Sequence, residues 1–130
     1  MQIVGRNSGV IMLCERLAAA TTARRAEWRV DGDDVFMWEQ DRGSVSIGSR
    51  DKDGQPPYEL GIYNPNGEKV EELASQLVEG DRPADWNEPL AELYRVARRS
   101  ALHADDIIDA LIDQLPAVAR DGGSFLTATE

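Results

Sequence analysis

One cysteine and one histidine are the residues in this sequence best suited to covalent chemistry. Nucleophilic catalysis by a thiol needs a basic partner within hydrogen-bonding distance. Cys14 falls on the apolar side of a predicted helix, where a small buried thiol is inert. His103 falls at the junction of two other predicted helices, where its ring can bond to a free backbone group. The two residues therefore do not predict a catalytic pair.

Two acidic clusters beside glycines have the oxygen donors that divalent cations prefer. Residues 51–54 (DKDG) begin like a calcium-binding loop, but the glycine is fourth where the sixth position is needed, and prolines follow. Residues 31–34 (DGDD) have no histidine nearby in the sequence. Tight turns explain both clusters. We predict no metal and, because a glycine-rich phosphate loop is also absent from the sequence, no cofactor.

Polar residues on the predicted strands offer a second kind of chemistry, because carboxylates can act as general acid and base without a histidine. Arg29 and Tyr63 could anchor an anionic small molecule. If the solvent-facing side of the sheet forms a cleft, it is lined by Arg29, Glu39, Glu59 and Tyr63. This gives one of two functional hypotheses, a small-molecule-binding or enzymatic domain that uses the solvent-facing side of the sheet.

Glycine turns separated by short alternating runs predict the sheet that would position these groups. Asp-Gly and Asn-Gly pairs suit tight hairpins because both residues can adopt positive φ. Four such turns occur, at Asp31-Gly32, Arg42-Gly43, Asp53-Gly54 and Asn66-Gly67. The apolar positions of the runs between them are Trp28, Val30, Phe36, Trp38, Val45, Ile47, Tyr58, Leu60 and Ile62. The pattern predicts a four-stranded antiparallel meander from Trp28 to Tyr63 with one buried face.

Apolar residues at helical spacing predict one helix before the sheet and three after it. Ser8 is expected to cap the first helix and Asn87 the third, and Pro116 ends the last. The predicted helices span about residues 8–25, 68–79, 88–101 and 104–115.

The fold class is therefore α+β in two layers, with helices covering one face of the meander. At 130 residues the chain has the length of one domain, which we place at 1–116. Residues 117–130 are predicted to be a disordered tail. The helical pair 87–116 is a candidate dimerisation or docking element.

The charge of the chain excludes some partners. The net charge is −10, and all of the excess lies after residue 50, because the first 50 residues carry equal numbers of acidic and basic side chains. An acidic field repels phosphate backbones and attracts basic surfaces, so we expect a basic protein partner and no nucleic acid. The apolar runs are far shorter than the ~20 residues that span a bilayer, so we expect no membrane insertion. Without a secretory signal pattern at residue 1, a cytoplasmic location is expected.

Opposite charges on the last two predicted helices indicate a protein-binding surface. The basic Arg95, Arg98 and Arg99 are followed by four aspartates on the next helix. These helices either fold back and pair with each other, or extend and pair antiparallel with a second copy, since an isologous dimer uses one patch twice. Trp86 either staples the start of a helix or is an exposed anchor. The candidate partner-binding residues are Trp86, Tyr94, Arg95, Arg98 and Arg99.

The main functional hypothesis is a non-enzymatic protein-interaction or regulatory module. It is expected to be a homodimer that also binds a basic protein through its acidic C-terminal half. Small acidic α+β proteins include chaperones of secreted bacterial effectors and immunity proteins that neutralise basic toxins. The chain is similar to both in size, charge and fold class alone.

Overall fold

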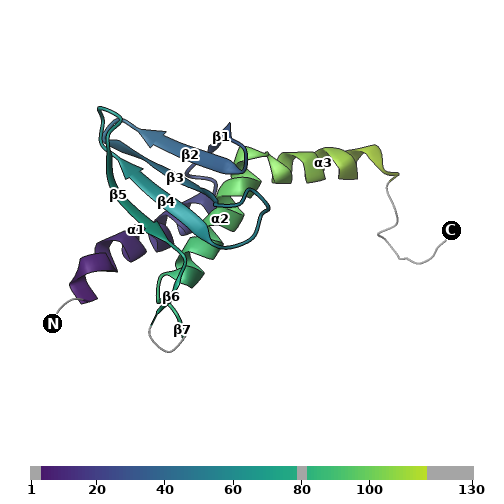
Figure 1. Cartoon of the computed structure of the whole chain (residues 1–130). Helices are drawn as coiled ribbons and strands as arrows, with labels where there is room; N and C mark the ends of the chain where they lie inside the picture. Colours follow the sequence, from purple (N-terminus) through teal and green to yellow (C-terminus); the bar gives the residue numbers. More distant parts are fainter. Residues whose placement is uncertain (1–3, 79–81, 117–130) are drawn as a thin grey trace.

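The computed structural model describes residues 4–78 and 82–116. The fold is α+β, with an N-terminal helix, a five-stranded antiparallel meander and two C-terminal helices (Figure 1). The predicted α+β class is confirmed, but in the described part of the chain the meander has one strand more than predicted, a separate two-stranded ribbon is present, and there is one helix fewer. The predicted tail at 117–130 lies outside the described residues.

The strands follow one another across the sheet in the order of the sequence, so each connection is a hairpin. In the centre of the sheet, Ile47 lies opposite Phe36 on one side and Leu60 on the other. The meander consists of β1 (Arg29–Gly32), β2 (Val35–Gln40), β3 (Gly43–Ser49), β4 (Tyr58–Tyr63) and β5 (Lys69–Ala74). A separate ribbon of two short strands, β6 (Leu77–Val78) and β7 (Arg82–Pro83), precedes the C-terminal helices.

The turn between β4 and β5 is built around the predicted Asn-Gly pair. The side chain of Asn64 accepts hydrogen bonds from the backbone N–H groups of Asn66 and Glu68 at 2.9 and 3.0 Å. Gly67 has a φ of 87°, in the left-handed region that glycine adopts without steric cost. The chain therefore reverses directly after β4.

This reversal corrects the helix predicted at 68–79, which is wrong. The segment forms β5, and Leu73 lies opposite Leu60 of β4. The exposed backbone edge of β4 offers hydrogen bonds to any segment that returns beside it. Pairing with that edge outweighs the helical spacing of the apolar residues, since tertiary context overrides a weak local preference.

The first hairpin turn lies just beyond the predicted pair at Asp31 and Gly32. Gly32 ends β1, and the residue with the left-handed backbone is Asp34, with a φ of 56°. Aspartate is one of the few residues other than glycine that adopts this conformation at low cost. The carboxylate of Asp34 also accepts hydrogen bonds from the Tyr94 hydroxyl and the Gly54 N–H. The hydrogen bonds of the Asp34 side chain therefore help to fix the position of this turn.

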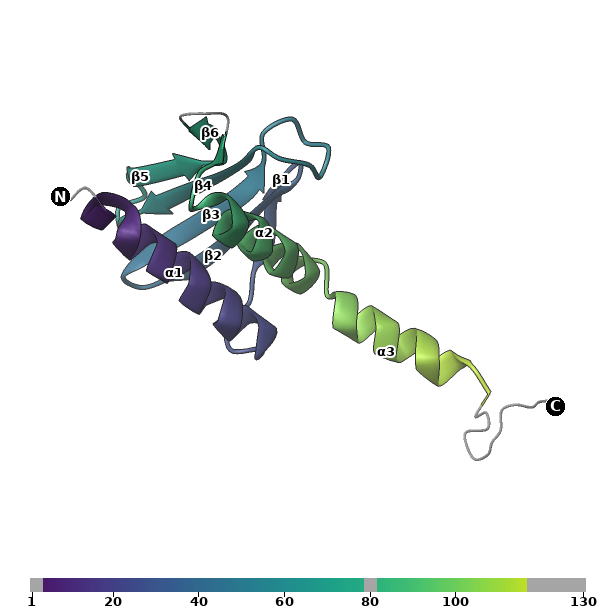
Figure 2. The same cartoon turned by 90° about the horizontal axis from the view of Figure 1, so that it is seen from below.

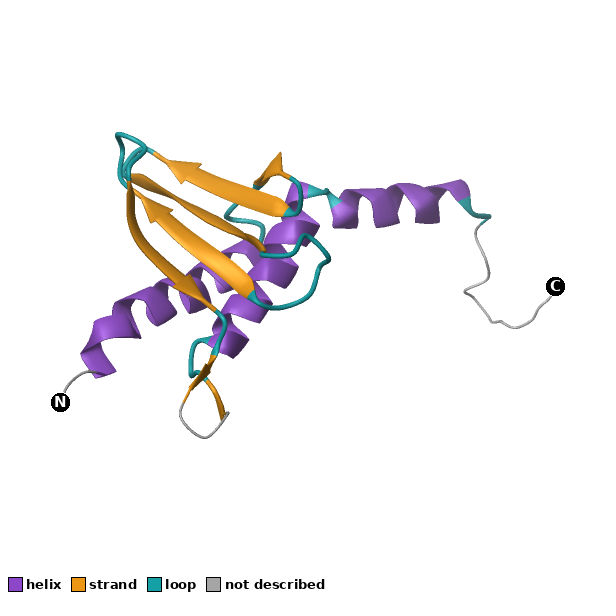
Figure 3. Ribbon diagram, in the orientation of Figure 1, coloured by secondary structure: helices purple, strands orange, loops and turns teal. Residues whose placement is uncertain are grey.

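Helices α1 (Val4–Thr22) and α2 (Asn87–Ala101) cover one face of the sheet, which gives the protein two layers (Figure 3). The apolar strand positions predicted for the core are buried or partly buried, except Val30 on edge strand β1, which is half exposed. The fully buried side chains in the centre of this core are Cys14, Ile47, Leu60, Leu90 and Leu93.

The predicted helices at 88–101 and 104–115 are confirmed as α2 and α3 (Ala104–Gln114). The caps predicted for α1 and α2, Ser8 and Asn87, are wrong. Ser8 lies inside α1. The side chain of Asn87 bonds to the backbone of Gln76, accepting from its N–H at 3.0 Å and donating to its carbonyl at 2.9 Å. Asn87 therefore ties the start of α2 to the segment after β5.

Trp28 connects both covering helices to the start of β1. Its side chain is 4 % exposed, and its indole Nε1 donates to Oγ1 of Thr21 in α1 at 2.9 Å. Thr21 in turn donates to the carbonyl of Leu17 at 2.7 Å. The backbone N–H of Trp28 donates to Oγ of Ser100 in α2 at 3.0 Å. The entry of the chain into the sheet is thus fixed to two helices at once.

Candidate functional site

Helix α3 projects away from the rest of the protein (Figure 2). None of its residues is buried, and the four large apolar side chains on it and that of its C-cap residue, Leu115, remain 44–66 % exposed. We call these residues the α3 face: Ile107, Ile108, Leu111, Ile112 and Leu115. Contiguous exposed apolar surface of this kind marks interaction sites in soluble proteins. No part of the described chain covers the α3 face.

The other side of α3 is acidic. At about 100° per residue, Asp106, Asp109 and Asp113 lie on the side of the helix roughly opposite the α3 face. All three residues are exposed. The helix is therefore amphipathic, and its polar side is one that water solvates well.

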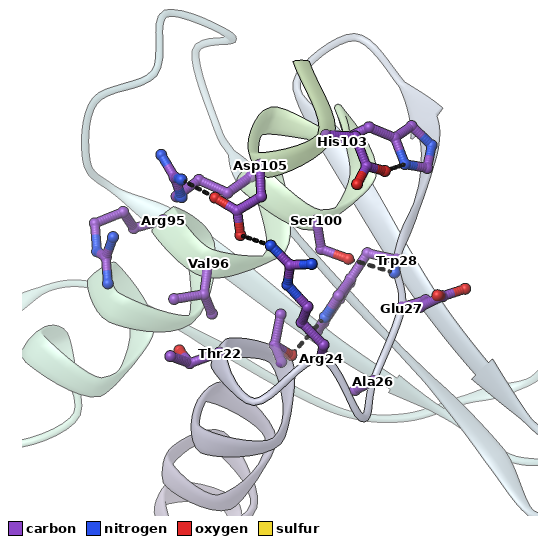
Figure 4. Close-up of a pocket in the computed structure, with 13 residues that line it drawn as sticks. Thr22, Arg24, Ala26, Glu27, Trp28, Arg95, Val96, Ser100, His103 and Asp105 are labelled. Atoms are coloured by element: carbon purple, nitrogen blue, oxygen red, sulfur yellow. Dashed lines mark hydrogen bonds and ion pairs between the residues drawn. The ribbon is translucent and has the colours of Figure 1, made fainter. Parts of the chain in front are cut away.

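Asp105, in the first turn of α3, connects this helix to the ends of α1 and α2. Its two carboxylate oxygens accept hydrogen bonds from Arg99 at 2.5 Å and from Arg24 at 3.2 Å, and Figure 4 shows the second pair. The hydrogen bond from Arg99 is the largest cause of the lowered pKa of Asp105. All three side chains are exposed, so water weakens both ion pairs. They direct α3 without burying any part of it.

The backbone at this junction turns sharply at a single residue. His103, between α2 and α3, adopts left-handed dihedrals with φ of 56° and ψ of 42°. Arg24, just after α1, is also left-handed, with a φ of 64°. Both residues line a pocket of about 380 Å³ whose walls come from the ends of α1 and α2 and the start of α3.

The predicted partner-binding residues do not form one surface. Tyr94 is 5 % exposed and lies in the core, where its ring stacks on that of Tyr58 with centroids 4.5 Å apart. Trp86 is half buried, and its indole Nε1 donates to the carbonyl of Ala74 at 2.8 Å. This contact is the one expected of a residue that fixes the start of α2.

The three arginines of α2 do lie on the surface, at the end from which α3 departs. Arg95 pairs with Glu92 of the same helix at 2.7 Å, and Arg99 pairs with Asp105. Arg98 is exposed on the same helix. The sequence left open whether α3 folds back against this patch or extends from it. In the structure α3 extends, and of its aspartates Asp105 reaches an arginine of α2.

The predicted ligand face is divided between two parts of the open sheet. On β1 and β2, Arg29 donates to Glu39 at 3.0 Å and to Asp31 at 2.8 Å. Two strands away on β4, Glu59 pairs with Arg50 at 2.7 Å. The structure therefore does not bring Arg29 and Glu59 together, and each is paired with a neighbour.

Tyr63, the fourth residue of that face, lies across the middle of the sheet. Its hydroxyl is 3.2 Å from Oγ of Ser46, and a Cβ added to Gly61 would lie 2.8 Å from the same hydroxyl. The glycine thus leaves room for the tyrosine ring. The hydroxyl is engaged within the sheet, and Tyr63 and Glu59 line one pocket of about 480 Å³ that does not include Arg29 or Glu39.

A polar cluster on the helix-covered side was missed by the sequence analysis. Asp34 accepts from the Tyr94 hydroxyl with one carboxylate oxygen and from the Gly54 N–H with the other, at 2.9 Å. Tyr58 donates to the carbonyl of Gly54 at 3.0 Å. Burial is the largest cause of the raised pKa of Tyr94, followed by its hydrogen bond to Asp34. The cluster links the first turn, the β3–β4 loop and α2, which is a structural role.

Replacing Asp34 by alanine is expected to lower the free energy of unfolding by about 2–3 kcal/mol. Alanine pays a penalty of about 1–2 kcal/mol in the left-handed region, and the buried Tyr94 hydroxyl loses its acceptor. Asp34→Asn should cost less, because asparagine tolerates this backbone and retains one oxygen. Urea denaturation of the two variants measures the difference, and equal stabilities would contradict the role given to this side chain.

Cys14 and His103 do not form the pair of thiol and base that nucleophilic catalysis needs. Cys14 is buried in the core, and burial raises the pKa of its thiol to about 11. His103 is exposed, with Nδ1 3.8 Å from a carboxylate oxygen of Asp106. Within residues 4–78 and 82–116, His, Cys, Asp and Glu side chains do not gather in groups of three or more that could hold a metal ion. The helices described here are all too short or too polar to cross a membrane.

Comparison with protein-family models, curated proteins and solved structures finds no match to this chain. The projecting α3 is therefore the feature of the chain itself that points most directly to a function. Its apolar positions are readable from the sequence, whereas its direction depends on one backbone conformation at His103 and one side chain at Asp105. The direction of α3 could not be predicted from the residue types at positions 103 and 105.

Proposed function

We propose that this chain is a non-enzymatic protein-interaction module that forms a homodimer through α3. The observation that carries the proposal is the α3 face, four large exposed apolar side chains on a helix with no buried residue and a fifth on its C-cap residue. A helix of 11 residues is marginal in water on its own, since short helices depend on packing for stability. A partner surface supplies that packing.

A second copy fits this helix in charge as well as in hydrophobicity. Each copy presents an acidic side on α3 and a basic end on α2, so two copies are complementary in a symmetric arrangement. An isologous interface uses the same patch on both subunits, which a patch carrying both signs permits. The burial of the Cys14 thiol in the core and the exposure of His103 on the surface support a role without covalent catalysis.

Amide hydrogen exchange of α3 at increasing protein concentration tests this function. Exchange from α3 is expected to slow as the concentration rises from micromolar to millimolar, because association covers the α3 face and stabilises the helix. Helix α2 serves as the internal reference, because its six buried residues anchor it in the core. If the amide hydrogens of α3 exchange at the same rate at every protein concentration, the proposed function is wrong.

A further inference from the structure

We propose that the α3 face of each copy docks into the groove between α1 and α2 of the other copy, so that two chains exchange their last helices. This inference rests on the proposed function, because it names the acceptor surface within that dimer.

The acceptor groove lies between the two helices that cover the sheet. It has a volume of about 880 Å³ and opens to solvent along both helices. Its polar lining residues are Glu15 and Thr22 on α1 and Glu88, Glu92 and Arg95 on α2. The other lining residues are small or compact: Ala18, Ala19, Ala23, Pro89 and Ala91.

The groove and the α3 face complement each other in shape. Alanines on the acceptor helices leave space for large side chains and allow helix axes to approach to about 8 Å. The α3 face supplies isoleucine and leucine side chains spaced along about three turns of helix. With this side against the groove, the acidic side of α3 remains in water. A large-into-small fit of this kind is how helices pack in protein cores.

The helix does not reach the groove of its own chain in this structure. Two residues separate α2 from α3, and the left-handed His103 together with the bridge from Asp105 to Arg24 and Arg99 sends α3 away from the body (Figure 2). The groove and the helix of one chain are thus both unpartnered within the described residues. Exchange between two copies is a low-cost way to join such elements.

The area of contact favours the groove over a direct pairing of two α3 helices. A strip about 16 Å long and about 10 Å wide gives a few hundred Å² for one helix pair. A specific, stable interface buries ~1,200 Å² or more. In the exchange two α3 faces and two grooves are buried, so the area is about twice that of one direct α3 pair. The exchange therefore comes closer to the size that a stable dimer needs.

Cross-linking between single-cysteine variants tests the acceptor. One sample of chains carries Ala19→Cys in the groove, and a second, tagged sample carries Leu111→Cys or Ile108→Cys on the α3 face. The samples are mixed, equilibrated and oxidised, and cross-linked pairs are counted by mass. The native Cys14 adds little background, because it is 1 % exposed and burial raises its thiol pKa to about 11. Asp109→Cys, on the acidic side of α3, is the matched control.

If two chains exchange their α3 helices, cross-linked pairs between Ala19→Cys and an α3-face cysteine should be at least ten times as abundant as pairs between Ala19→Cys and the Asp109→Cys control. Pairs formed mainly between two Leu111→Cys or two Ile108→Cys chains would overturn the proposal and show α3 against α3 instead. An absence of all cross-links from chains that sediment as dimers would also overturn it, while leaving the proposed function standing. Monomeric chains without cross-links would overturn both.

Discussion

Replacing Trp28 by alanine is expected to lower the free energy of unfolding by about 3–5 kcal/mol, the usual range for removing a buried tryptophan. The side chain is 4 % exposed, and its removal leaves a large cavity between α1, α2 and the start of β1. The variant also loses the hydrogen bond from the indole Nε1 to Oγ1 of Thr21. This is the largest loss of stability that we expect from a single substitution in this chain.

Trp28→Phe separates the two contributions, because phenylalanine preserves most of the apolar volume and lacks the indole N–H. It is expected to cost less than the alanine variant, with a hydrogen-bond share of about 1 kcal/mol. Urea denaturation followed by circular dichroism measures both variants. A loss below about 1 kcal/mol for Trp28→Ala would contradict the placement of this residue in the core.

Placing an aspartate at Leu111 is expected to weaken self-association at least about 100-fold while leaving the fold intact. Burial of a central apolar anchor in an interface is commonly worth about 2 kcal/mol or more, and the substitution occurs once in each copy. Leu111 is 59 % exposed in the single chain, so its replacement removes no core contact. The variant should therefore unfold at nearly the same urea concentration as the parent protein when both are dilute.

Ala110→Asp is the matched control for this variant. It adds the same negative charge to the same helix at an exposed position, one turn from Asp106 and from Asp113 on the acidic side. Its dimerisation should weaken far less than that of Leu111→Asp. If the two variants weaken association equally, added charge is the cause and the apolar contact has no special role.

The sheet was largely readable from the sequence because its signals are local. Alternation of apolar residues placed Phe36, Val45 and Leu60 on one buried face, and the structure buries all three. The Asn66-Gly67 pair was also read correctly as a hairpin turn. A turn of that kind requires a strand on each side, and the helix predicted at 68–79 did not meet this requirement.

The helix predicted at 68–79 shows where local signals conflict. Val70 and Leu73 fit helical spacing, and the glutamates nearby suit the first turn of a helix. The hydrogen-bonding edge of β4, which lies outside this segment, causes the segment to form β5. The residue pattern of the segment does not contain that information.

The candidate site was predictable in part. The apolar and acidic sides of α3 follow from residue spacing, and the helix begins at Ala104 as expected. The burial of Tyr94 was missed because its hydroxyl partner, Asp34, is 60 residues away in the sequence. The direction of α3 depends on a left-handed backbone at His103, which residue type does not specify.

Sedimentation equilibrium of the parent protein and of Leu111→Asp tests the central claim most directly. The parent chain is predicted to sediment at twice the 14.4 kDa of one chain, and the variant at the mass of one chain. A parent protein that stays at 14.4 kDa up to millimolar concentration would contradict the proposal that α3 is a dimerisation element.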